Sequence, residues 1–387
     1  MALFASILLV YFGPSSAYLS SFPSDLSTVQ NMNPATSILK FKCSALLFMC
    51  ILMTLVFPLP ALGMSANDWN LKVFGHAEVA TGKDALISDA FELGEVALFT
   101  TARLNSRWSI LSEISYLPKR YRSDTVKVER LRLRYELSTN HWMSFGKMHT
   151  PVNEWNDAFH HGRLFFPSID RPFAFSEFVP VHEVGLRFSG ENLGSKRLFY
   201  DLVLGSGQSA GDDVFPSGVK SFTASSGFWP TDNLKLRLAA YKDTLIDHLL
   251  DSSHGAEHNA MMADMVPEDL KYQAFGASLI YNNPAFDALT ELLAFRSEGS
   301  DTSYSIYQRI GFKRAGPMTP YVFADYLTVD PTERHFAAGD NKKLGLGLEW
   351  LLGSAASLKF ELTREDVNRS DREFAGTAFR LQFAFGI

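Results

Sequence analysis

Three arginines at alternate positions, Arg130, Arg132 and Arg134, form the most distinctive charged pattern in the chain. In an extended strand, residues two apart point to the same side, so the three guanidinium groups would form a column on one face. The opposite face is apolar and carries Leu131, Leu133, Tyr135 and Leu137. If the arginine face meets water enclosed by the sheet, the column would attract anions and repel cations, because a low-dielectric wall focuses the field of the charges.

The same arginines could instead be neutralised by carboxylates on the same wall. Candidate partners in the sequence are Glu92, Glu136 and Glu183. The number of charges does not identify which of them pair locally. The sequence therefore leaves two hypotheses open, an anion-selective surface and a neutralised network.

A second concentration of polar and charged side chains lies in the segment 149–180. Its charged residues and histidines are Glu154, Asp157, His160, His161, Arg163, Asp170 and Arg171. Aromatic residues are interspersed among them: Trp155, Phe159, Phe165, Phe166, Phe173 and Phe175. A connection this long needs a function or a surface on which to pack. Its aromatic residues predict that it folds into the interior of the protein, where its charged side chains would form a constriction.

We predict no catalytic residues, no cofactor and no bound metal. Adjacent histidines in an extended segment point in opposite directions, so His160 and His161 are poorly placed to share a metal ion. Both cysteines, Cys43 and Cys50, lie in an apolar run near the N-terminus, and none follows. The rest of the chain therefore has no disulfide framework and no thiol nucleophile. We do not expect an enzyme.

Beyond residue 68 the sequence follows a two-residue period, and clusters of Gly, Pro, Asn, Asp and Ser interrupt it. Lys235 and Arg237, for example, oppose Leu234, Leu236 and Leu238, which adds Arg237 to the polar face. The pattern predicts antiparallel strands with one apolar and one polar face. The expected strands are 71–80, 90–104, 107–117, 126–137, 141–148, 181–189, 196–205, 218–228, 233–242, 271–281, 285–296, 302–313, 319–327, 342–352, 357–365 and 374–386.

The lengths of the connections indicate how the sheet is arranged. Connections after even-numbered strands are short, whereas those after odd-numbered strands are usually longer, notably 149–180, 206–217, 243–270, 328–341 and 366–373. Short periplasmic turns that alternate with longer external loops are typical of outer-membrane barrels, and a soluble sandwich has no reason to keep this order. We predict an all-β transmembrane barrel of sixteen strands, or eighteen if 206–217 or 243–270 contains another pair.

The N-terminal region predicts export. A basic segment precedes an almost uncharged apolar run, 43–62, which ends in small residues. This order is typical of a secretory signal peptide, with Met32 as the expected start. We assign 1–66 to an upstream extension and the signal peptide, and 67–387 to the barrel. The alternative is a membrane-spanning helix, which two prolines near the end of the run disfavour.

Several motifs resemble a known family. General outer-membrane porins have a long third external loop that folds inward, and 149–180 has the same place in the order of connections. Four motifs resemble the corresponding stretch of phosphate-selective porins: Gly146-Lys147-Met148-His149-Thr150-Pro151, Asp170-Arg171-Pro172, Val179-Pro180 and Glu183-Val184-Gly185-Leu186-Arg187-Phe188-Ser189-Gly190. This resemblance implies a trimeric sixteen-strand channel in which wall cations guide anions, with Arg130, Arg132, Arg134, Lys147 and Arg187 as candidates. It does not identify phosphate as the solute, because no dense lysine cluster is present.

The last strand resembles the signal that the barrel assembly machinery of the outer membrane recognises. Aromatic residues alternate from Phe379 to Phe385, although Gly386 and Ile387 follow the last phenylalanine. The net charge of −6 and the pI near 5.9 do not favour nucleic acid as a partner.

The expected function is an outer-membrane porin, a passive diffusion channel for small polar solutes with a possible preference for anions. The expected partners are outer-membrane lipid, the solutes, the barrel assembly machinery and two further copies in a homotrimer. The alternative is a barrel without a transport function, either an enzyme or an adhesin that uses its external loops.

Overall fold

The computed structural model describes residues 68–82, 90–118, 125–159, 162–208, 221–246, 269–313 and 316–387. All sixteen predicted strands are present in these ranges. They are β1 (Trp69–Gly82), β2 (Ala90–Arg103), β3 (Trp108–Leu117), β4 (Thr125–Ser138), β5 (His141–His149), β6 (His182–Leu193), β7 (Leu198–Gly205), β8 (Ser221–Thr231), β9 (Leu234–Ile246), β10 (Asp269–Asn282), β11 (Phe286–Ser297), β12 (Ser303–Phe312), β13 (Met318–Val329), β14 (Gly339–Leu351), β15 (Ala356–Arg369) and β16 (Arg372–Gly386). The predicted extension and signal peptide, 1–66, lie outside the described residues.

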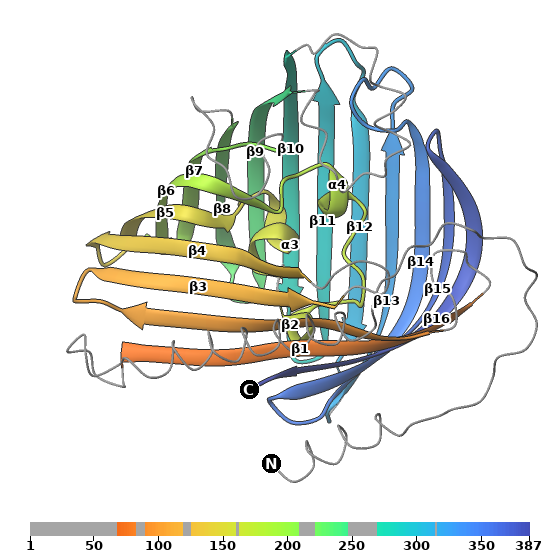
Figure 1. Cartoon of the computed structure of the whole chain (residues 1–387), viewed down its shortest axis with the longest axis horizontal. Helices are drawn as coiled ribbons and strands as arrows, with labels where there is room; N and C mark the ends of the chain where they lie inside the picture. Colours follow the sequence, from red (N-terminus) through yellow and green to blue (C-terminus); the bar gives the residue numbers. More distant parts are fainter. Residues whose placement is uncertain are drawn as a thin grey trace, which may run out of the picture. The chain divides into compact units, whose positions relative to one another are not determined.

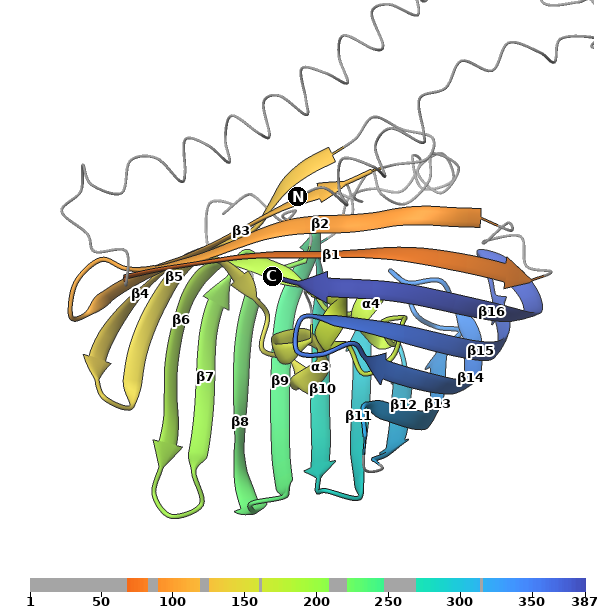
Figure 2. The ribbon, with the colours of Figure 1, turned by 90° about the horizontal axis from the view of Figure 1, so that it is seen from below.

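The sixteen strands form one closed antiparallel barrel (Figures 1 and 2). Each strand pairs with its neighbours in the sequence, and β1 closes the ring by pairing with β16, with Phe74 opposite Gly386 and Gly82 opposite Ala378. Closure satisfies the backbone of every strand, which is a requirement for a sheet that crosses lipid. The predicted fold class is confirmed, with sixteen strands rather than eighteen in the closed ring.

The predicted alternation of connections holds with two exceptions. The connection from β11 to β12, 298–302, is no longer than the connection from β12 to β13, 313–317. Two residues, Ser370 and Asp371, join β15 to β16, whereas the sequence predicted a longer connection at 366–373. The ends of these strands are rich in polar residues, and this composition is typical of a loop. Pairing continues through them, because Asp366 lies opposite Ala375 and Asn368 lies opposite Glu373. Backbone hydrogen bonds here extend beyond the apolar part of the strands.

The outer face of the barrel is apolar. Leu238, Leu344 and Leu346 are 68%, 64% and 60% exposed on it, and the inner residues between them are buried. Near the end that carries the short turns, the rings of Tyr281 and Phe286 stack at 5.0 Å. An apolar band with aromatic residues at its margin is the lipid-facing surface of a transmembrane barrel. No helix among the described residues is long and apolar enough to cross a membrane.

The hydrophobic core lies inside the ring of strands. The connection between β5 and β6 enters the barrel and contains α3 (Asn153–Ala158), η3 (Arg163–Phe165) and α4 (Ala174–Glu177) (Figures 1 and 2). Its aromatic residues pack against inward-facing aromatic residues of the wall, which include Tyr241, Tyr272, Phe295, Tyr307 and Tyr321. The inward loop is therefore as predicted. The wall beneath it is not uniformly polar, because it also carries the aromatic surface on which the loop buries its rings.

Substitution of Leu238 by Arg tests the assignment of the outer face. Leu238 lies near the middle of the apolar band, so we expect Leu238→Arg to reduce the free energy of unfolding by about 2 to 4 kcal/mol. Denaturant unfolding in lipid vesicles measures this change. Leu238→Ala is the control and should cost less, because it buries no charge in lipid. Equal stability of the Arg and Ala variants would contradict a lipid-facing position.

Candidate functional site

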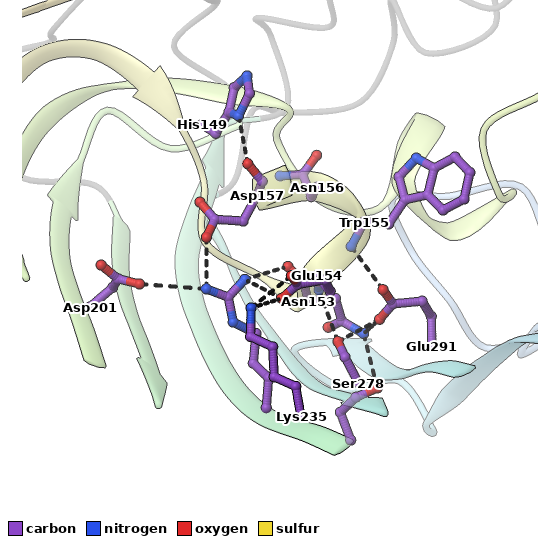
Figure 3. Close-up of polar contacts among 12 residues, drawn as sticks. His149, Asn153, Glu154, Trp155, Asn156, Asp157, Asp201, Lys235, Ser278 and Glu291 are labelled. Carbon is purple, nitrogen blue, oxygen red and sulfur yellow. Dashed lines mark hydrogen bonds and ion pairs between the residues drawn. The ribbon is translucent and has the colours of Figure 1, made fainter. Parts of the chain in front are cut away.

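The candidate site is the lumen where the inward loop meets the wall, and it begins at α3 (Figure 3). Asn153 adopts a left-handed backbone conformation with φ 62°, which asparagine tolerates better than most residues. Its Nδ2 donates hydrogen bonds to Glu291 Oε2 at 2.8 Å and to the carbonyl of Leu292 at 2.9 Å. A Cβ atom on Gly276 of β10 would lie 1.6 Å from Asn153 Oδ1. The glycine thus allows the loop to approach the wall closely.

The wall also caps the helix. The residue before α3, Val152, offers no side-chain cap, and the first N–H groups of a helix need acceptors. The backbone N–H of Glu154 donates to Ser278 Oγ at 2.9 Å, and that of Trp155 donates to Glu291 Oε1 at 2.8 Å. Side chains of β10 and β11 therefore replace the missing local cap and fix the start of α3 (Figure 3).

Asp157, at the other end of α3, lies between two arginines of the wall. Its carboxylate accepts a hydrogen bond from Arg187 at 3.2 Å and one from Arg237 at 2.7 Å. Asp201 of β7 lies 2.9 Å from Arg187 and 3.6 Å from Arg237. Burial alone would raise the pKa of Asp157, but the two guanidinium groups hold it well below its usual range. The ion pairs thus stabilise the folded loop at neutral pH and would be lost only as the pH falls through that depressed pKa.

Glu154 has a separate partner on the same wall. Lys235 Nζ lies 2.7 Å from its Oε1, and the guanidinium of Arg237 lies 3.6 Å from its Oε2. Both predicted acidic residues of α3 are therefore bound to cations of β6 and β9. They hold the loop in place and are not free charges in the lumen.

The second half of the loop is attached to β13 to β16. Asp170 pairs with Lys343 at 3.0 Å and with Arg380. Three further contacts follow along the loop: Ile169 N donates to Glu361 at 2.7 Å, Phe173 N donates to Asp325 at 2.8 Å, and Glu177 pairs with Arg369 at 2.5 Å. The loop thus contacts the inner wall at both ends.

Two predicted cations of the loop stabilise the loop itself. Arg163 Nη1 donates to the carbonyl of Ile169 at 2.7 Å and lies over the ring of Phe166. Arg171 Nη1 donates to the carbonyl of Phe175 at 3.0 Å. Burial lowers the pKa of Arg171 to about 10, which leaves it charged at neutral pH. His160 and His161 lie outside the described residues.

The arginine column of β4 contains both paired and unpaired groups. Arg130 pairs with Glu113 at 2.6 Å, a carboxylate of β3 that was not among the predicted partners. Arg132 makes no hydrogen bond or ion pair within the described residues, and its Nε is buried without an acceptor. Arg134 lies over the ring of Trp142 at 3.9 Å. Lys147 is only 5% exposed, and it lies opposite Leu131 and Val184 rather than opposite the arginine face of β4. The structure therefore does not support the prediction that Lys147 lines the lumen.

The unpaired arginines border a cavity. Arg132 and Arg134 line a space of about 290 Å³ together with Arg103, which the sequence analysis did not single out. The other polar side chains that line it are Asp68, Asn70, Thr101 and Ser109. These residues come from the short-turn ends of β1 to β4, which places the cavity near the predicted periplasmic end. Three guanidinium groups and one carboxylate give it a positive balance.

Most wall residues that hold the loop were missed by sequence reasoning. Lys235 is on the predicted polar face of its strand, but its pairing with a residue 81 positions earlier has no local signal. Other contacts of the loop likewise come from buried polar residues on the inner face of their strands: Ser278, Asp325, Lys343 and Glu361. Within the described ranges, no group of three or more His, Cys, Asp or Glu side chains could hold a metal ion.

One further motif bears on the enzyme hypothesis. The segment Gly207-Gln208-Ser209-Ala210-Gly211 fits the Gly-x-Ser-x-Gly spacing of a nucleophile elbow. That motif belongs to a strand-to-helix turn in an α/β fold, whereas β7, which ends at Gly205, is a strand of an antiparallel barrel. Ser209 lies outside the described residues, so the structure assigns it no catalytic partner.

Comparisons with known proteins support the fold. Neither a model of any protein family nor a curated protein matches the chain. Among solved structures, OprB of Pseudomonas putida aligns with a TM-score of 0.59 at 10% identity over 83% of this chain and 94% of its own. An anion-selective porin of Comamonas acidovorans aligns with a TM-score of 0.56 at 9% identity over 82% and 100%. The trimer form of OmpT of Vibrio cholerae aligns with a TM-score of 0.54 at 14% identity over 82% of this chain and 99% of its own.

These matches define the class of fold. The chain is a sixteen-strand barrel of the kind found in outer-membrane porins. Together with the apolar outer face, the closed barrel locates the protein in a bacterial outer membrane. No comparison supports the narrower resemblance to phosphate-selective porins, which stays a prediction.

Substitution of Gly276 tests the attachment of α3. A side chain at this position would overlap Asn153, so we expect Gly276→Val to displace α3 from the wall and to increase the single-channel conductance or its noise. The control is Ala277→Val, the next residue of β10, which faces outward. The close approach of α3 would be contradicted if Gly276→Val and Ala277→Val gave the same conductance as the unmodified protein.

Proposed function

We propose that the protein is a passive diffusion channel for small polar solutes and that it prefers anions. The observation that supports this function most directly is Arg132, a lumen-facing guanidinium that makes no hydrogen bond or ion pair with a carboxylate among the described residues. Other wall cations, such as Arg187 and Arg237, are neutralised by carboxylates of the loop and the wall. Selectivity then depends on the cations that remain unpaired.

The surroundings of Arg132 favour anions over cations. Arg103 and Arg134 border the same cavity, and the amide and hydroxyl groups of Asn70 and Ser109 offer further hydrogen bonds. Stacking on Trp142 orients the Arg134 guanidinium without neutralising it. Clustered charges of one sign beside a low-dielectric wall produce a potential on the order of several kT, which raises the local concentration of anions.

Two comparisons are consistent with this proposal. One structural neighbour, from Comamonas acidovorans, is described as an anion-selective porin. The motifs that resemble phosphate-selective porins also include Lys147 and Arg187, although one is buried and the other is paired. We therefore propose small anions as a class and do not single out phosphate.

We extend the proposal to a homotrimer. Its support is OmpT of Vibrio cholerae, a structural neighbour that was solved in a trimer form. Sedimentation of the folded protein in detergent should give the mass of three chains. The mass of one chain would contradict the trimer and leave the channel proposal intact.

Planar bilayers test the channel and its selectivity together. We expect stepwise conductance and, in a KCl gradient, a reversal potential whose sign corresponds to anion preference. The double variant Arg132→Ala/Arg134→Ala should move that potential toward the cation side, because it removes two unpaired positive charges. The matched control is Arg130→Ala/Glu113→Ala, which removes a neutral ion pair and should have little effect.

Three outcomes would contradict the proposal. A folded protein without conductance would exclude a channel and favour a barrel that serves as an enzyme or adhesin. A cation-selective reversal potential would exclude anion preference. Equal effects of the two double variants would show that the unpaired arginines do not control selectivity.

A further inference from the structure

A row of polar residues crosses the outer face of the barrel at three adjacent strands. Gln273 of β10 lies opposite Lys242 of β9 and opposite Arg296 of β11. All three side chains are on the outward face, since the inner neighbours Tyr241, Tyr272 and Phe295 are buried in the core. The three strands lie side by side in Figure 1. Two cations thus lie on the outer face of the barrel, next to the apolar band that contacts lipid.

The row lies at the outer margin of the apolar band. Ten positions of β11 separate Arg296 from Phe286, which marks the other margin, and for strands tilted by about 40° this distance corresponds to about 25 Å of membrane. Tyr304, which is 55% exposed, lies opposite Ala294, one outward position below Arg296. Aromatic residues are typical of the membrane interface. Lys242 and Arg296 therefore lie at the level of the lipid head groups in the external leaflet.

These residues line a cavity of about 470 Å³ on the outer surface. The charged side chains that line it are Lys242, Lys271, Arg296 and Glu298, three cations and one carboxylate. Glu298 lies 3.5 Å from Lys271. Gln273 Oε1, in the orientation that satisfies its amide, accepts a hydrogen bond from Arg296 Nη2 at 2.6 Å. Lys242 makes no hydrogen bond or ion pair within the described ranges.

An outward-facing cation of β14 offers a contrast, because it has carboxylates beside it. On β14, Lys342 lies 3.6 Å from Asp340 and opposite Asp366 of β15. No carboxylate lies opposite Lys242 or Arg296 in the row, where the shared neighbour is the neutral Gln273. The row thus carries two positive charges with no carboxylate opposite either of them.

The surface below the cations suits acyl chains. The next outward row consists of Ala240, Phe275 and Ala294, so that two small residues flank one ring. Phe275 is 58% exposed. An amphiphile with an anionic head group and several acyl chains would match both the cationic cavity and this apolar surface.

We propose that Lys242 and Arg296 form a binding site for a phosphorylated lipid of the external leaflet. The lipid phosphate lies between the ammonium and guanidinium groups, which form charge-assisted hydrogen bonds with its oxygens. Lys271 contributes further positive charge at the rim of the cavity. The acyl chains lie along the apolar outer face of β9 to β11. This site is separate from the lumen and does not depend on the proposed channel function.

Lipid binding to the folded mature protein in detergent tests the site. The probe is lipid A with both phosphates, measured by native mass spectrometry across a concentration series. We expect Lys242→Gln/Arg296→Gln to weaken binding about 30-fold, because each cation near the lipid surface contributes about 1 kcal/mol. The control variant, Lys342→Gln/Arg364→Gln, removes the same charge from the outer face of β14 and β15 and should leave binding unchanged.

Two further measurements identify which part of lipid A is bound. Lipid A without its phosphates should bind the unmodified protein as weakly as phosphorylated lipid A binds the double variant. Inorganic phosphate at millimolar concentration should not compete, because it lacks acyl chains. Either an equal loss of binding in the control variant or indifference to the lipid phosphates would overturn the proposal. Competition by inorganic phosphate would overturn the assignment to a lipid.

We expect the double variant to fold, because both side chains are exposed. Folding is checked by gel electrophoresis: the folded variant should migrate differently before and after heating, as the unmodified protein does. If the double variant fails this check, the single variants Lys242→Gln and Arg296→Gln replace it, and each should weaken lipid A binding about 5-fold. Unchanged binding in both single variants would overturn the site.

Discussion

The inner architecture depends on the ion pairs of Asp157 with Arg187 and Arg237. They connect the loop to β6 and β9, and Asp201 of the wall supplies a second carboxylate for the same arginines. Removing one partner from such a buried group commonly costs about 3 to 5 kcal/mol, because the remaining charge stays uncompensated. The loop therefore has a strong electrostatic reason to stay inside the barrel, in addition to the burial of its aromatic residues.

In the proposed channel, this attachment also determines which charges remain available to a solute. Carboxylates of the loop and the wall neutralise Arg187, Arg237 and Lys343. On β4, in contrast, Arg132 has no such partner within the described residues. A channel with many wall cations can thus owe its preference to few of them. The same reasoning applies on the outer face, where two cations without a carboxylate opposite them, rather than the total charge, support the proposed lipid site.

The sequence predicted the strands well, because the two-residue period and the turn residues are local signals. It also predicted the inward loop from the aromatic residues between Trp155 and Phe175. It could not predict the ion pairs, since Asp157 and Arg237 are 80 positions apart and inner charged residues look alike in the sequence. The resemblance suggested Arg187 as a free guide for anions, whereas the structure shows it paired with two carboxylates. The two-residue period also did not predict that aromatic residues on the inner face would form the surface on which the loop packs.

The central claim is that unpaired guanidinium groups of β4 bind anions in the lumen. Anomalous diffraction from crystals grown in bromide would test it most directly. The proposed function predicts a bromide ion within hydrogen-bonding distance of Arg132 or Arg134, in the cavity that these residues line. Bromide ions bound only at other positions in the lumen, with this cavity empty, would contradict the claim.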